Sequence, residues 1–446
     1  MDGAHHAQRR RQSEDLARKL RAFVENVAEA ILDDPTKFLT GLFEAAVAAA
    51  QPSLRVPGHL PEPPKGRTIV IGGGKAGGAM AAAVEAHYKA EVSGLVITRY
   101  DYAAPTEKIE IIEAAHPVPD AAGMAAAERM LEMVSGLSED DLVLCLISGG
   151  GSALMALPAD GISLEEKQSV GQTLVRSGAA INEINVVRKH LSKIKGGRLA
   201  RASAPARLVT LVISDVVGDD LSAIASGPTV PDPSSYADAL AVVLKYDLQL
   251  PSSAMRVLEA GGDETPKPGD VIFDGNEIAI IASGSNSLEA AAKFAKAAGI
   301  TPIILDDSLE GEARQVGRAM AELVEKYRDQ APCVLLSGGE LTVTVKGAGK
   351  GGPNTEFLMG LASGLKGAAG VYALACDTDG ADGLVDNAGA MITPDTLERA
   401  EQKGLDFGAL LADNDAYSFF AALGDLVVSG PTHTNVNDFR AILIEP

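Results

Sequence analysis

Three carboxylates lie within six residues at the point where an apolar run ends. The run at 371–376 is typical of a buried strand, and Asp377, Asp379 and Asp382 follow it, interleaved with Gly380 and Gly383. Acids cluster this closely after a strand when something cationic binds to them. Mg²⁺ in proteins is usually held by one or two carboxylates plus phosphate oxygens. The spacing therefore predicts that Asp377, Asp379 and Asp382 hold a magnesium ion that serves a phosphorylated ligand.

Three glycine-rich turns also follow apolar runs. The first, at 72–77, has the pattern G-x-G-x-x-G between a strand and a helix, which can present backbone N–H groups to phosphate. The other two, at 148–152 and 337–340, would let a ligand approach the backbone closely. A tight turn or a plain loop without a ligand is the alternative at each. The candidate phosphate or substrate ligands are Gly73, Gly74, Ser148, Gly149, Gly150, Gly151, Ser152, Ser337, Gly338, Gly339 and Glu340.

Basic residues that could meet an anion stand out in an acidic chain. Lys75 lies where the helix after the first glycine turn begins, which is unfavourable for the helix dipole unless an anion is near. The stretch 185–198 is the most basic in the chain, and on an expected helix at 181–199 Arg188 and Lys195 share a face. Arginine can bind carboxylate or phosphate with two hydrogen bonds. A solvated helix face is the alternative.

Composition excludes several classes of protein. The net charge is 39 − 60 = −21, which argues against a nucleic-acid surface. No apolar run approaches the roughly 20 residues of a membrane span, and the N-terminus lacks the apolar segment of a secretory signal. The three cysteines lie in apolar runs without zinc or disulfide spacing. We therefore expect a cytoplasmic protein that binds neither nucleic acid nor membrane.

The order of the expected elements predicts an α/β fold with two domains, each a mostly parallel sheet flanked by helices, and an active-site cleft between them. An amphipathic helix is expected at 13–33. Strands and helices then alternate, and a breaker-rich stretch at 261–275 interrupts them. The expected domains are a Rossmann-like domain at 13–260 and a second α/β domain at 276–446, joined by a linker at 261–275.

Taken together, the motifs resemble those of the class II glycerate 2-kinases, also called the MOFRL family, whose older members were often labelled hydroxypyruvate reductases. The resemblance covers nearly the whole chain beyond the first expected helix. Pro353 departs from the pattern, because relatives more often have arginine there. The matching stretches are 72–77, 116–120, 148–152, 187–199, 214–215, 227–229, 337–340, 377–383 and 432–438.

The resemblance implies ATP- and Mg²⁺-dependent phosphorylation of D-glycerate to 2-phosphoglycerate. Phosphoryl transfer depends on positioning and charge neutralisation. Lys75 and Arg188 would offset charge at the transferred group, Asp215 could accept the hydroxyl proton, and Lys195, Asn354 and Glu356 are further candidate ligands. Which turn binds ATP and which binds glycerate stays open, and a homodimer is compatible with the sequence.

Two other functions compete with the kinase. An NAD(P)H-dependent hydroxypyruvate reductase would use the G-x-G-x-x-G turn, and Arg99 could hold a 2′-phosphate. The acid that binds the ribose is not at the expected strand end, however, and hydride transfer does not explain the carboxylates. A regulator that binds sugar or acid phosphates would use similar anion sites without needing clustered acids for magnesium.

Overall fold

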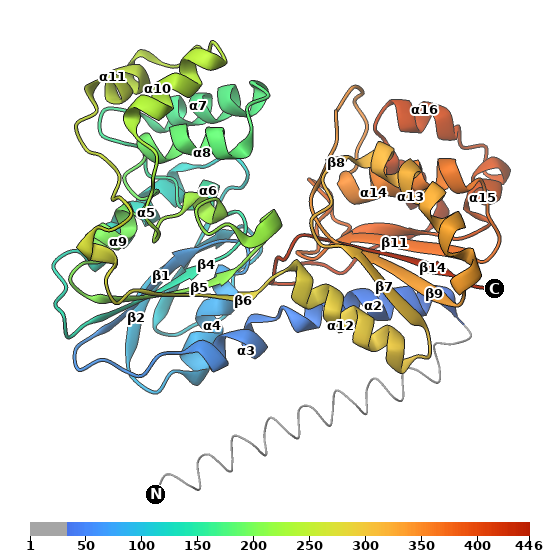
Figure 1. Ribbon diagram of the computed structural model, residues 1–446, viewed down its shortest axis with the longest axis horizontal. Helices are drawn as coiled ribbons and strands as arrows, with labels where there is room; N and C mark the ends of the chain where they lie inside the picture. Colours follow the sequence, from blue (N-terminus) through green and yellow to red (C-terminus); the bar gives the residue numbers. More distant parts are fainter. Residues whose placement is uncertain (1–33) are drawn as a thin grey trace, which may run out of the picture. The chain divides into compact units, whose positions relative to one another are not determined.

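The computed structural model describes residues 34–446 and divides into two compact units. Unit 1 contains residues 34–49, 284–430 and 438–446, and unit 2 contains residues 50–283 and 431–437 (Figure 1). The helix expected at 13–33 lies outside the described residues. In the part of the chain that the structure describes, no helix has both the length and the apolar character needed to cross a membrane.

Unit 2 is built on a six-stranded sheet in which every pairing is parallel. The strand order is β3-β2-β1-β4-β5-β6, so β1 and β4 lie side by side in the middle although two helices and two strands separate them in sequence. Central strands of such a sheet are apolar on both faces, and β1 and β4 are buried at every position. The strands are β1 Thr68–Gly73, β2 Val92–Arg99, β3 Ile109–Ala114, β4 Leu142–Ile147, β5 Arg207–Ile213 and β6 Glu277–Ala282.

Helices cover this sheet and also form a separate layer. Helix α4 (Gly77–His87) packs in one apolar cluster with the sheet, and α5 (Ala121–Val134) packs in another. Four further helices share an apolar core of their own and lie above the sheet in Figure 1. This helical layer consists of α7 Leu164–Arg176, α8 Ile181–His190, α10 Tyr236–Lys245 and α11 Ser252–Ala260.

Two expectations about the chain order are corrected. The expected helix at 181–199 ends at His190, because the Ser192 hydroxyl accepts the N–H groups of Ile194 and Lys195 and the chain turns there. The stretch 261–275 belongs to unit 2, where Asp263 bonds to Arg198 and Arg201, and β6 extends the first sheet. The units therefore divide between residues 283 and 284 rather than within 261–275.

Unit 1 contains a second six-stranded sheet, in the order β13-β12-β11-β14-β9-β7. Only β7 and β9 pair in parallel, and the other four pairings are antiparallel. Across both sheets most pairings are parallel, but the parallel arrangement belongs chiefly to unit 2. The strands are β7 Thr301–Asp306, β9 Cys333–Ser337, β11 Val371–Asp377, β12 Gly389–Ile392, β13 Leu426–Val427 and β14 Asp438–Ile444. A two-stranded pair is formed by β8 Gly311–Glu312 and β10 Leu341–Thr342.

Helices cover both faces of the second sheet. Helices α2 (Pro35–Ala49) and α12 (Gly284–Ala297) share one apolar cluster with the strands. Helices α13 (Ala313–Tyr327) and α14 (Pro353–Leu365) share the other with α15 Thr396–Gln402, α16 Phe407–Ala412 and α17 Ala416–Leu423. The α/β class and the two helix-flanked sheets are thus as the sequence predicts.

Glycines let α13 and α14 approach backbone to backbone. A Cβ atom on Gly317 would lie 2.2 Å from the carbonyl oxygen of Phe357, and one on Gly360 would lie 2.4 Å from that of Arg314. We expect Gly317→Ala to destabilise the protein by about 2 kcal/mol, because the added methyl group must push the helices apart. Denaturant unfolding followed by circular dichroism measures this change.

Gly408→Ala in α16 is the matched control, since its Cβ would meet no atom closer than 3.5 Å. This variant should stay within about 0.5 kcal/mol of the parent chain. Equal unfolding midpoints for Gly317→Ala and the parent chain would show that the close helix contact is not needed.

Candidate functional site

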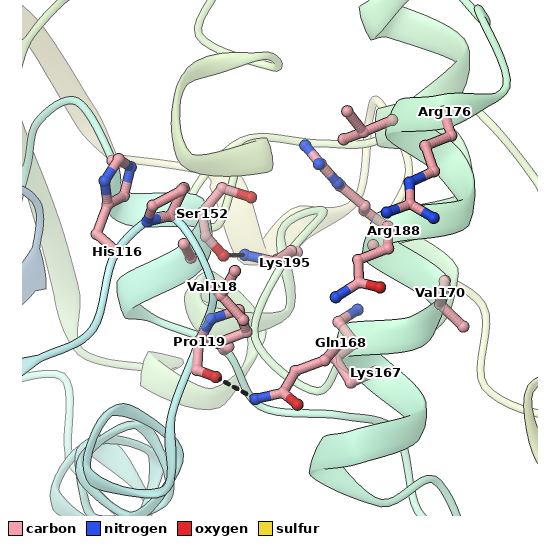
Figure 2. Close-up of a pocket in the computed structure, with 17 residues that line it drawn as sticks. His116, Val118, Pro119, Ser152, Lys167, Gln168, Val170, Arg176, Arg188 and Lys195 are labelled. Carbon is pink, nitrogen blue, oxygen red and sulfur yellow. Dashed lines mark hydrogen bonds between the residues drawn. The ribbon is translucent and has the colours of Figure 1, made fainter. Parts of the chain in front are cut away.

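A cavity of about 450 Å³ lies within unit 2 and is lined by cations and apolar side chains. Its volume is in the range of small-molecule sites. Gln168 of α7 donates a hydrogen bond of 2.7 Å to the carbonyl oxygen of Pro119 and so ties α7 to the segment at 116–119 (Figure 2). The charged or polar residues that line the cavity are His116, Ser152, Lys167, Gln168, Gln172, Arg176, Arg188 and Lys195. The apolar residues that line it include Val118, Val170 and Val175.

Three of the cations reach the cavity from different parts of the chain. Lys167 is on α7, Arg188 is on α8, and Lys195 follows the turn that ends α8. The Lys195 ammonium donates to the carbonyl oxygen of Ser152 at 2.6 Å (Figure 2), and the Lys167 ammonium donates to that of Leu191 at 3.2 Å. Arg188 and Lys195 therefore line the same cavity, but the turn after α8 places Lys195 there, and the two do not share a helix face as predicted.

The electrostatics of these cations are unusual. Burial lowers the pKa of Lys167 to about 7, and the nearby charge of Arg188 adds to the shift. Burial also lowers the pKa of Lys195 well below its ordinary value, with Lys167 and Arg188 as further causes, and burial lowers the pKa of Arg188. Within residues 34–446, no ion pair joins any of the three to a carboxylate. Buried cations without an acid favour an anionic ligand.

The second glycine turn forms one wall of this cavity. Gly150 has a left-handed backbone with φ of 78°, and a Cβ there would lie 3.0 Å from the His116 ring and 3.3 Å from the Lys75 side chain. In the described part of the chain, the N–H groups of Gly149 and Gly150 have no hydrogen-bond acceptor. Free backbone donors in such a turn suit an anion. The structure thus brings Lys75, Gly150, Ser152, Arg188 and Lys195 into one region.

Asp215 lies directly behind this turn. Its carboxylate accepts a hydrogen bond of 3.1 Å from the Asn435 amide, and its carbonyl oxygen accepts one of 2.9 Å from Asn437. A Cβ on Gly149 would lie 2.0 Å from the Asp215 carboxylate, so only glycine allows this contact. The segment at 431–437, which belongs to unit 2, therefore holds Asp215 beside the turn.

The first glycine turn does not offer the expected donors. Its successive N–H groups are already bonded within the protein: Gly74 to Ile97, Lys75 to Gly149 at 2.8 Å, and Ala76 to the Ser148 hydroxyl at 3.0 Å. The sequence pattern predicts a phosphate cradle at Gly73 and Gly74, but these glycines instead bring the first turn against the second.

The predicted magnesium ligands do not form a cluster of three. Among the described residues, no group of three or more His, Cys, Asp or Glu side chains is arranged to hold a metal ion. Asp382 is buried and caps α14: its two oxygens accept the N–H groups of Asn354 and Thr355 and the Thr355 hydroxyl. Asp377 and Asp379 each accept a backbone N–H two residues ahead, from Asp379 and Ala381. The prediction that all three acids hold metal is therefore corrected for Asp382.

The remaining candidates in unit 1 have structural partners. Buried Glu356 pairs with Arg314, and the Asn354 amide donates to Asp438 at 2.7 Å. The carbonyl oxygen of Gly338 accepts a bond of 2.8 Å from Arg440. A Cβ on Gly339 would lie 2.3 Å from the Leu309 backbone. Ser337 is buried in β9 and Glu340 is exposed. These contacts give Gly338, Gly339, Asn354 and Glu356 roles inside the protein.

Sequence reasoning missed Lys167, Gln168 and Arg176, and it noted His116 only within a family motif. Lys167 shares the buried face of an amphipathic helix with Val170 and Leu174, and a lysine at that spacing was a signal for a functional residue. Nothing in the sequence shows that α7 faces the turn at 148–152.

Comparison with known proteins gives consistent matches over both units. Residues 38–259 match the model of a domain of unknown function, DUF4147, and residues 333–438 match that of the MOFRL family. A D-glycerate 2-kinase of Thermotoga maritima is 41% identical over 92% of this chain and 98% of its own length. A protein of Agrobacterium vitis whose name provisionally assigns hydroxypyruvate reductase activity is 54% identical over 91% of this chain and 94% of its own.

The fold is also found in a solved structure. The crystal structure of a glycerate kinase from Thermotoga maritima has a TM-score of 0.81 and 39% sequence identity, covering 92% of this chain and 99% of that one.

Asp382 should make stability depend on pH. Burial raises its pKa from 3.8 to about 6, so the folded state binds the proton more tightly than the unfolded state. The free energy of unfolding should therefore fall as pH rises from about 4 to about 6, by at most about 3 kcal/mol. Asp382→Asn cannot titrate, and we expect a smaller fall across this window in denaturant unfolding.

Asp406→Asn is the control, because Asp406 caps α16 at the surface. It should keep the pH dependence of the parent chain. An unchanged slope in Asp382→Asn would contradict the assignment to Asp382.

Proposed function

Because the chain belongs to the MOFRL family of glycerate 2-kinases, we propose that it transfers the γ-phosphoryl group of ATP to the 2-hydroxyl of D-glycerate, giving 2-phosphoglycerate and ADP. The observation that carries this proposal is the cavity of unit 2, in which Lys167, Arg188 and Lys195 have no carboxylate partner in the described chain. A site of this charge suits a carboxylate or a phosphate. The kinase names of relatives that cover nearly the whole chain support the reaction.

The proposed chemistry needs charge neutralisation more than covalent catalysis. The glycerate oxygen forms a bond to the γ-phosphorus while the bond from that phosphorus to the bridging oxygen of ADP breaks, and the hydroxyl proton leaves. Lys195 and Arg188 would bind the anionic groups, together with the free N–H groups of Gly149 and Gly150. Lys75 lies beside Gly150 and would offset charge at the transferred group.

Asp215 is the proposed acceptor of the hydroxyl proton. Its carboxylate lies against Gly149, and the Asn435 amide fixes the orientation of that carboxylate. A base must lie within hydrogen-bond reach of the proton that it takes, and the contact with the anion-binding turn supports this role.

Two of the three predicted carboxylates of unit 1 still fit a magnesium ion. Mg²⁺ commonly takes one or two carboxylates and completes its shell with phosphate oxygens and water. Asp382 is used by the α14 cap, so Asp377 and Asp379 would hold the ion. When bound with ATP, Mg²⁺ neutralises phosphate charge. ATP and Mg²⁺ are thus the proposed cofactors.

The proposed location is the cytoplasm, and the three free, buried cysteines support it.

A hydroxypyruvate reductase is the competing function, since that name is given provisionally to similar proteins of Agrobacterium vitis. Against it, the N–H groups of the G-x-G-x-x-G turn that would bind the dinucleotide are bonded inside the protein. Arg99, which could hold a 2′-phosphate, lies over the ring of Tyr102 at 5.3 Å.

Activity assays separate the two functions. The protein should form ADP when given D-glycerate, ATP and Mg²⁺, and should form no NAD(P)⁺ from hydroxypyruvate and NAD(P)H. Lys195→Met and Arg188→Gln should each lower kcat/KM for glycerate by about 100-fold, because each removes a charged hydrogen-bond donor worth about 3 kcal/mol.

Arg201→Gln is the control, because this half-exposed arginine pairs with Asp263 away from the cavity. It should keep the parent rate. NAD(P)⁺ formation without ADP formation would overturn the proposal. Near-parent rates in both cavity variants would show that the cavity is not the site of the reaction.

A further inference from the structure

The cavity of unit 2 holds more positive charge than its surroundings can balance. Lys167 and Lys195 are buried, with 8% and 1% of their surface exposed, and Arg188 lies beside them. The other charged or titratable groups that line the cavity are Arg176 and His116. Like charges that are buried in one cavity disfavour one another strongly.

Nearby acids do not offset this charge. Asp160 is exposed and pairs with Lys193, and Glu165 and Glu166 bond to Ser163 at the start of α7. The buried Asp232 pairs with Lys189 on α8, and Glu264 lies near His190. Asp215, behind the turn at Gly149, accepts a hydrogen bond from Asn435. Each of these acids therefore has another partner, and none lines the cavity.

The two ammonium groups still have donors to offer. An ammonium has three N–H bonds, and in the described chain Lys195 donates one to Ser152 while Lys167 donates one to Leu191. The remaining donors, the Arg188 guanidinium and the Gly150 N–H suit several oxygens at once. A monoanion would leave part of this charge unbalanced.

We propose that this cavity binds a small organic anion with at least two negative charges, a phosphate ester next to a carboxylate, and that the anion enters together with a proton taken up by the Lys167–Lys195 pair. The choice of a phosphorylated hydroxy acid rests on the proposed function, whose product has this chemistry. Without the anion, repulsion keeps the pair short of full protonation, and the incoming anion reverses that balance. Lys167 is thereby a ligand-binding residue that no sequence motif indicates.

Proton uptake gives the proposal a direct readout. Isothermal titration of 2-phosphoglycerate into the full chain at pH 8.5, in Tris and in HEPES, reports the number of protons taken up from the difference in heat between the buffers. We expect uptake approaching one proton per anion. Affinity should fall as pH rises from 7 to 9, by up to about tenfold per pH unit for one linked proton.

Variants of Lys167 separate charge from protonation. Lys167→Arg stays charged at every pH used, so it should bind without proton uptake by this residue and with a flatter pH dependence. Lys167→Met should bind at least about tenfold more weakly at pH 7. Lys193→Met is the matched control, because Lys193 is exposed, pairs with Asp160 and does not line the cavity. It should match the parent chain.

Several outcomes would overturn the inference. Binding of 2-phosphoglycerate with no proton uptake and no pH dependence would show that anion binding is not coupled to protonation. Uptake that depends on Lys167 with ADP but not with 2-phosphoglycerate would assign the cavity to the nucleotide. Kinase activity is measured separately on the same variants, so an active kinase with Lys167-independent product binding would refute this inference and leave the proposed function standing.

Discussion

The site of unit 2 depends on the close contact between the turns that follow β1 and β4. A Cβ on Gly74 would lie 2.1 Å from the Ser148 hydroxyl, and that hydroxyl accepts the Ala76 N–H at 3.0 Å. The two strands are neighbours in the sheet, so their turns must pass each other at the same edge. Glycine makes this possible because it has no side chain to separate the backbones. Lys75 and the wall of the cavity at 148–152 take their positions from this contact.

Because of this contact, two turns of similar sequence use their backbone N–H groups differently. The first turn uses its N–H groups to hold the second, and the second keeps the N–H groups of Gly149 and Gly150 without an acceptor in the described chain. Around it, the helical layer brings Lys167 and Arg188 into a place where their charge is costly without a ligand. This cost is typical of binding sites, where stability is given up for affinity. The left-handed backbone of Ala225 and Ser226, next to Ser152, is a further strained feature at this site.

The acids of unit 1 show how one motif can serve two purposes. Asp382 gives its oxygens to the N-terminus of α14, where a carboxylate is favoured by free N–H groups and by the helix dipole. Its partners come earlier in the chain, at the start of a helix that precedes β11. Asp377 and Asp379 each accept a backbone N–H in the turn that follows β11, and their place at the end of that strand keeps them as the proposed magnesium ligands.

Apolar runs and breakers in the sequence were enough to determine the α/β class and the place of the glycine turns, because these features depend on local composition and burial. The motifs were enough to indicate the family. Tertiary structure alone decided that β6 completes the first sheet, that β11 is antiparallel to both its neighbours, and that Lys167 lines the same cavity as Lys195. It also decided that Asp382 caps α14 and that the first glycine turn bonds to the second, since these hydrogen-bond partners lie far apart in sequence and no local pattern records them.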